Sequence, residues 1–217
     1  RDSDHRGADQ RIVESARISY KSPSKGDEQD KRLLRYLFKN AHSSPFEMSK
    51  ITFNIKLPIF VMRQFVRHRM QNLNEMSARY TKLHNDFYIP NQNQWRIQSE
   101  KNKQSSNQLE DFYPCIIDGD LELEMTDVVS QHCQNSYNLY EAMLEEGIAR
   151  EMARMILPVN IYTEIYSTWD MNNLIKFFKL RDDSHAQSEI QEYACAMKDI
   201  VKEIFPWTME IYEETIN

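Results

Sequence analysis

Glycine is scarce in this chain of 217 residues, which contains only four. At the average usage of about 7%, a protein of this length would contain roughly fifteen. The four glycines are too scattered to form either G-x-G-x-x-G or G-x-x-x-x-G-K-[ST]. The glycine-rich backbone sites of Rossmann and P-loop proteins are therefore excluded. We expect any phosphate-bearing ligand to be held by side chains.

The chain also lacks an excess of positive charge, a C-x-x-C motif and any long apolar run. A net charge of −6 argues against a nucleic-acid partner. The three cysteines, Cys115, Cys133 and Cys195, predict a reducing, intracellular compartment, which we take to be the cytoplasm. No run of 18 apolar residues occurs and the first residues are polar, so we expect no membrane span and no signal peptide. No metal site is expected either.

Hydrophobic periodicity predicts a single domain over residues 1–217, of the α/β class (α+β type) with a small antiparallel sheet flanked by helices. Period-two alternation predicts a strand at 50–57, and an abundance of β-branched and aromatic side chains predicts another at 159–169. Helical spacing predicts helices over 8–17, 27–40, 121–146 and 148–156, and another from Met171. The sequence Ser184-His185-Ala186-Gln187 resembles a capping box that opens the last helix. The polar stretch 91–107 has no period, which indicates a long surface loop.

Basic side chains are concentrated between Pro58 and Lys82. This segment contains one acid, Glu75, and five basic residues, Arg63, Arg67, Arg69, Arg79 and Lys82. A basic cluster within an acidic protein suits a specific small anion, and arginine binds phosphate through two parallel hydrogen bonds. Composition alone is equally compatible with a solvated amphipathic helix whose ion-pair partners lie elsewhere.

A helix is predicted to start at Pro58, and its geometry restricts the tripeptide Arg67-His68-Arg69. These three side chains would be spread over roughly 200° of a regular helix, so they cannot all meet one ligand. Either the helix ends there, or the tripeptide serves two ligands on two sides.

Beyond the tripeptide, an extended segment is predicted to present alternate residues to opposite faces. An acid, a hydroxyl and a guanidinium would share one face, from Glu75, Ser77 and Arg79. The opposite face would carry Met76, Ala78 and Tyr80.

The sequence RHRMQNLNEMSARY, in which seven residues separate Arg67-His68-Arg69 from Ser77, resembles the signature of the flavin-dependent thymidylate synthases. Four other segments are similar to that family in the same order. They are HSSPFE at 42–47, ARMILP at 153–158, LRDDSHAQ at 180–187 and Pro206-Trp207. The resemblance covers about Ser15 to Tyr212, apart from the loop near residues 91–120.

The resemblance implies a flavoprotein methyltransferase of dTMP biosynthesis. It would methylate dUMP with methylenetetrahydrofolate as carbon donor and FAD, reduced by NADPH, as hydride carrier. It would be a homotetramer of unusual mixed α/β fold, with active sites shared between subunits. None of the three cysteines lies in a matched motif, so no cysteine nucleophile is expected.

The same resemblance implies roles for individual residues. Arg181 would polarise the uracil ring and His42 would lie near flavin and folate; these are the catalytic candidates. The cofactor candidates are Ser44, Arg67, His68, Arg69, Glu75, Asp170, Asn172 and Lys176. The substrate candidates are Gln64, Arg67, Glu75, Met76, Ser77, Ala78, Arg79, Arg154 and Arg181.

Some alternatives stay open. Asp170, Asn172 and Lys176 depart from the residues commonest at those family positions; Asp170 also suits a helix cap, and Lys176 a solvated helix face. A protein that kept the anion site without catalysis would be a non-catalytic nucleotide-binding oligomer.

Overall fold

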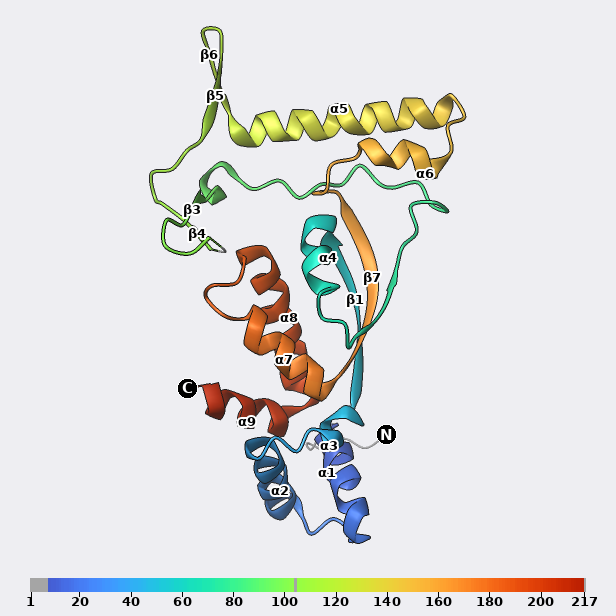
Figure 1. Ribbon diagram of the computed structural model, residues 1–217, viewed down its shortest axis with the longest axis vertical. Coiled ribbons are helices and arrows are strands. Elements are labelled where there is room, and N and C mark those ends of the chain that lie inside the picture. The colour runs from blue at the N-terminus through green and yellow to red at the C-terminus, as the bar shows by residue number, and fades with distance from the viewer. Residues whose placement is uncertain (1–7, 104, 217) are drawn as a thin grey trace. The chain divides into compact units, whose positions relative to one another are not determined.

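The computed structural model describes residues 8–103 and 105–216 (Figure 1). The chain forms two compact units. Unit 1 comprises the described part of Arg1–Phe53 together with His68–Asn72 and Ser167–Asn217. Unit 2 comprises Asn54–Arg67 and Leu73–Tyr166. Two strands, β1 (Lys50–Pro58) and β7 (Tyr162–Asp170), run from one unit into the other.

Unit 1 is mainly helical. Its α-helices are α1 (Asp9–Arg17), α2 (Asp27–Lys39), α3 (Ser44–Glu47), α7 (Met171–Arg181), α8 (Ser188–Ile204) and α9 (Pro206–Ile216), and the short 3₁₀ turn η1 (Ile18–Tyr20) follows α1. Helix α7 packs on α3 and α8, and α9 packs on α8 and α2. Large aromatic side chains fill the core between these helices, among them Trp169, Phe177, Phe178, Phe205 and Tyr212.

Unit 2 contains α4 (Ile59–Phe65), the long helix α5 (Met125–Glu145), α6 (Arg150–Ala153) and the 3₁₀ turns η2 (Gln92–Gln94) and η3 (Arg154–Ile156). Two antiparallel hairpins join β3 (Ile97–Gln98) to β4 (Ser106–Asn107), and β5 (Cys115–Asp118) to β6 (Leu121–Glu124). Its core is the cluster of Leu83, Tyr137, Tyr140, Ala153 and Ile161. No helix in the described part of the chain is long and apolar enough to cross a membrane.

The central sheet has the strand order β1-β7-β2, with β2 at Asn72–Glu75. Phe53, Ile55 and Leu57 are buried at alternate positions of β1, as the period-two pattern predicts. The mixed α/β class with small antiparallel sheets is confirmed.

Three sequence predictions of element boundaries are wrong. Residues 121–124 belong to the β5–β6 hairpin, whose turn contains Gly119 at a φ of +62°, so the long helix begins only at Met125. The loop 91–107 contains η2, β3 and β4. Strand β7 starts at Tyr162, because Ile161 N donates to Pro158 O in a turn.

The predicted capping box is also wrong. Helix α8 begins at Ser188, and Gln187 at its N-cap makes no capping hydrogen bond. The preceding residues form a turn in which Asp183 Oδ1 accepts from His185 N at 2.8 Å. The last helix is α9, which starts at Pro206.

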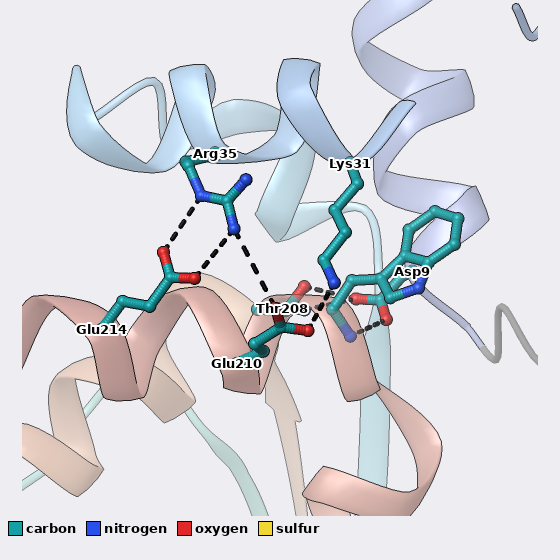
Figure 2. A network of polar contacts seen from close by, with 7 residues as sticks. Asp9, Lys31, Arg35, Thr208, Glu210 and Glu214 are labelled. Atoms are coloured by element: carbon teal, nitrogen blue, oxygen red, sulfur yellow. Dashed lines mark hydrogen bonds and ion pairs between the residues drawn. The ribbon is translucent and has the colours of Figure 1, made fainter. Parts of the chain in front are cut away.

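A buried carboxylate ties the start of the chain to α9 (Figure 2). Asp9 Oδ2 accepts from Trp207 N at 2.7 Å, and Asp9 Oδ1 accepts from Thr208 N at 3.0 Å. On the surface nearby, Arg35 of α2 forms two hydrogen bonds with Glu214 of α9. Burial raises the pKa of Asp9 to about 6, although hydrogen bonds from Trp207 and Thr208 act in the opposite direction. The N-terminal helix is thus held to α9 by a group that titrates near neutrality.

We expect Asp9→Asn to remove a pH dependence of stability. The pKa of Asp9 is 3.8 in the unfolded chain and about 6 in the folded one, so folding is favoured at low pH and this contribution is lost as pH rises through 6. Relative to the variant, the wild type should lose about 1 kcal/mol of unfolding free energy between pH 5 and pH 7. Urea denaturation at the two pH values measures the difference. Glu210→Gln, a change at an exposed carboxylate of the same network, should keep the wild-type pH dependence of stability. If the unfolding free energies of the wild type and Asp9→Asn changed equally with pH, Asp9 would not be the group responsible.

Candidate functional site

The tripeptide Arg67-His68-Arg69 follows the end of a helix. Helix α4 ends at Phe65, with Val66 at its C-cap, and Arg67 N donates to Gln64 O at 3.3 Å. The first alternative, that the helix ends before the tripeptide, is therefore correct. Arg67 belongs to unit 2, whereas His68 and Arg69 belong to unit 1.

A cavity of about 270 Å³ in unit 2 brings five of the predicted substrate residues together. They are Glu75, Met76, Ser77, Ala78 and Arg154. Apolar side chains of Ile59, Leu83, Leu157 and Ile161 line the same cavity, and Leu83 and Ile161 belong to the unit 2 core. The cavity therefore offers a rigid apolar wall beside a hydroxyl, a carboxylate and a guanidinium.

The backbone around Ser77 explains how adjacent residues reach one cavity. Strand β2 ends at Glu75, and Met76 N still donates to Glu164 O at 2.9 Å. Ser77 then opens a turn, because Tyr80 N and Thr81 N both donate to Ser77 O at 3.0 Å. The prediction of two opposite faces over residues 75–80 is wrong, since the extended chain stops where that turn begins.

Glu75 is held by a buried hydroxyl. Thr163 Oγ1 donates to Glu75 Oε1 at 2.9 Å, and Thr163 is 3% exposed within β7. This hydrogen bond fixes the direction in which the Glu75 side chain points.

Two members of the basic cluster have acidic partners. Arg79 Nη2 lies 3.0 Å from Glu151 Oε2, and Lys82 forms an ion pair with Glu141. The alternative that ion-pair partners of the basic cluster lie elsewhere in the chain therefore holds for Arg79 and Lys82, whose positive charges face these two carboxylates. Gln64, Arg67 and Arg79 do not line the unit 2 cavity, and their substrate roles stay predictions.

Unit 1 contains a second cavity, of about 300 Å³, between the end of α2, α3 and α7. Three predicted residues line it: His42, Asn172 and Lys176. Its walls also include Phe38, Phe46 and Ile175, together with the cation of Lys179. Aromatic walls, an amide and two lysines suit a ligand that combines a flat ring system with phosphate, which is the chemistry of a flavin dinucleotide.

Two other predicted cofactor residues are placed differently. Ser44, the first residue of α3, is exposed and does not line the unit 1 cavity. Asp170 is the N-cap of α7: its Oδ1 accepts from Asn173 N at 2.9 Å and its Oδ2 from Asn173 Nδ2 at 2.7 Å. The helix-cap alternative for Asp170 is therefore present in the structure, while its cofactor role stays a prediction.

Arg181 and His68 are direct partners. Arg181, the last residue of α7, donates from Nε to His68 Nε2 at 3.0 Å. Burial, with a contribution from the charge of Arg181, lowers the pKa of His68 to about 4, and burial lowers the pKa of Arg181 as well. The histidine is therefore neutral at physiological pH and accepts a charge-assisted hydrogen bond.

Sequence reasoning missed three residues that shape these sites. Lys179 lies one helical turn after Lys176, so its helical spacing was a usable signal. The partners Thr163 of Glu75 and Glu151 of Arg79 are distant in sequence, and no local pattern marks them.

The cysteines are poorly suited to nucleophilic attack. Cys115 donates to Glu122, and this hydrogen bond raises the pKa of its thiol. Burial and the hydrogen bond to Asp182 raise the pKa of Cys195, and Cys133 is 2% exposed. A nucleophilic cysteine needs a lowered pKa and an accessible thiolate.

Comparison with known proteins places these cavities in context. The family model described as thymidylate synthase complementing protein matches residues 3–207. The flavin-dependent thymidylate synthase of Wolbachia pipientis wMel is 44% identical over 211 residues, which cover 97% of this chain and 72% of that protein. The enzyme of the same name from Thermosipho africanus is 42% identical over 209 residues, covering 96% and 88%. Among solved structures, the UMP/dUMP methylase PolB of Streptomyces cacaoi, bound with 5-Br dUMP, matches with a TM-score of 0.77 and 28% identity over 96% of this chain and 91% of PolB.

Proposed function

The chain belongs to the family of thymidylate synthase complementing proteins, and we propose that it converts dUMP to dTMP by reductive methylation. It is an enzyme of the flavin-dependent thymidylate synthase type, a methyltransferase of dTMP synthesis. Methylenetetrahydrofolate would supply the carbon, and NADPH would be the reductant.

The unit 2 cavity carries this proposal. It joins Ser77, Glu75 and Arg154 to an apolar wall, a combination that suits a nucleotide with a flat base, sugar hydroxyls and a phosphate. Arg154 is exposed at this cavity, where its guanidinium can pair with a phosphate. The predicted substrate residues that meet here come from segments about 75 residues apart, 75–78 and 154.

The unit 1 cavity is the proposed binding site of FAD. When bound, FAD carries the hydride from the reductant to the reacting carbon. His42, Asn172 and Lys176 would hold it there, with Lys179 as an additional cation for its phosphates. The remaining cofactor assignments, for Ser44, Arg67, His68, Arg69, Glu75 and Asp170, follow the family resemblance.

Arg181 would stabilise the negative charge that develops on the uracil ring, because a guanidinium stays protonated even where burial lowers its pKa. No cysteine nucleophile takes part, in keeping with the raised pKa values of Cys115 and Cys195.

Further parts of the proposal concern assembly and setting. The enzyme is a homotetramer with active sites shared between subunits, built from one functional domain over residues 1–217. It works in the cytoplasm on dUMP and folate, without a nucleic-acid or membrane partner.

The test uses the purified full chain. We expect an oxidised-flavin band at about 450 nm and dTMP formation that requires dUMP, methylenetetrahydrofolate and NADPH together. A protein with no such band, and none after FAD is added, would contradict the proposal. Binding of dUMP without dUMP-dependent oxidation of reduced flavin would instead identify a non-catalytic nucleotide-binding oligomer.

The matched control is a variant without cysteines, with Cys115→Ser, Cys133→Ala and Cys195→Ser combined. Its kcat should stay within about threefold of the wild type, because no thiol takes part. A complete loss of dTMP formation in a folded, flavin-loaded variant would show that a cysteine is needed.

A further inference from the structure

His68 lies in an aromatic pocket of unit 1 next to Arg181. Its ring packs edge-on against Phe177, with centroids 4.9 Å apart, and lies 5.9 Å from Trp169. Both of these neighbours are buried, and their own rings are 5.1 Å apart. The imidazole is therefore oriented by rigid core side chains.

The hydrogen bond defines the tautomer of His68. Arg181 Nε–H can donate to Nε2 only if that nitrogen carries no proton, so the neutral ring carries its hydrogen on Nδ1. The ring of His68 faces one charged group, Arg181, and two uncharged rings, those of Trp169 and Phe177. The lowered pKa of His68, about 4, keeps this acceptor neutral.

Arg181 needs such a contact because of where it lies. It is the last residue of α7, and an arginine side chain at a helix end has several rotatable bonds. The guanidinium is planar, so a hydrogen bond at Nε sets the plane in which both terminal nitrogens lie.

We propose that His68 is a positioning residue, whose neutral imidazole accepts from Arg181 Nε and thereby aims the guanidinium at the reacting uracil. This inference rests on the proposed function, in which Arg181 acts on that ring. It is compatible with the cofactor contact expected for His68, because Nδ1 lies on the other edge of the imidazole. Correct aim matters because a small misplacement of a catalytic group can cost about a hundredfold in rate.

Two substitutions separate positioning from packing. His68→Phe keeps an aromatic ring against Trp169 and Phe177 but removes the acceptor, whereas His68→Gln keeps an acceptor near Nε2 and removes the ring. We expect His68→Phe to lower kcat by about 10- to 100-fold and His68→Gln by less than about fivefold, with little change in KM for dUMP. A merely structural role predicts the reverse order, and that result would overturn the proposal.

A double-mutant cycle makes the test specific for the pair. In an Arg181→Ala background, His68→Phe should cause no further loss of kcat, because no guanidinium remains to be aimed. Independent, multiplicative losses would overturn the proposal. The flavin band of each variant is measured alongside, so that a loss of FAD is not counted as a loss of aim.

Nitrogen-15 NMR of histidine-labelled protein tests the pair without any turnover. The wild type should show His68 as the Nδ1–H tautomer, and Arg181→Gln should raise the pKa of His68 above its value of about 4. If this signature is present but dTMP is never formed, the proposed function fails while the hydrogen bond stands. If dTMP is formed and His68→Phe retains full kcat, the positioning role fails while the proposed function stands.

Discussion

Arg181→Lys is expected to lower kcat by about 10²- to 10³-fold, the cost typical of removing one donor that stabilises charge in a transition state. Lysine keeps the positive charge but has neither the planar fork nor an Nε–H that could donate to His68. The loss should fall on kcat more than on KM for dUMP, because the interaction strengthens as charge develops on the uracil ring. Steady-state rates of dTMP formation, measured with the flavin content of each preparation, check this.

Arg35→Lys is the matched control for that substitution. Arg35 also forms hydrogen bonds through a guanidinium in unit 1, but its partner is the surface carboxylate of Glu214. The same chemical change there should leave kcat within about twofold. If Arg181→Lys turned over as fast as Arg35→Lys, Arg181 would have no catalytic role.

Arg154→Gln is expected to weaken dUMP binding by about 10- to 100-fold. Arg154 lines the unit 2 cavity beside Ser77 and Met76, and a charge-assisted hydrogen bond to phosphate is worth about 1.5–3 kcal/mol. Because the lost partner is the phosphate, affinity for deoxyuridine, which has none, should hardly change. Calorimetric titration of both ligands measures the difference.

Arg150→Gln tests whether the effect is local. Arg150 opens the same short helical segment, is exposed, and does not line the unit 2 cavity. Its replacement should leave both affinities near the wild-type values, apart from a small long-range effect that salt would screen. Equal losses for dUMP and deoxyuridine in Arg154→Gln would exclude a phosphate contact.

Helices and strands with a strong hydrophobic periodicity could be predicted from the sequence, but their first and last residues were predicted less accurately. The alternation of Phe53, Ile55 and Leu57 identifies β1 because one face of that strand is buried. The β5–β6 hairpin was missed because Leu121 lies four residues before Met125 and so fits the helical spacing that continues into α5. The capping box at 184–187 failed because Asp183 binds His185 N and holds those residues in a turn.

At the candidate site, too, the sequence marked the residues of the motif but not the way they are arranged. The signature around Ser77 marks a stretch whose residues do meet in one cavity, yet the sequence assigned Met76 and Ala78 to the wrong face, since it contains no local sign of the turn at Ser77. Pairs such as Thr163 with Glu75, or Arg181 with His68, join residues about a hundred positions apart. No local periodicity encodes contacts of that range.

The sequence by itself determined which chemical groups this protein can use. Four glycines exclude a glycine-rich backbone cradle for phosphate, so we expect side chains to hold any phosphate, and the motif order identifies the family. The tertiary structure alone decided which of those groups lie together: Arg154 with Ser77 in one cavity, Lys176 with His42 in another, and Arg181 with a neutral His68. The physical reason is that residue type is a property of each position, whereas burial, charge state and hydrogen-bond geometry arise only when distant segments pack against one another.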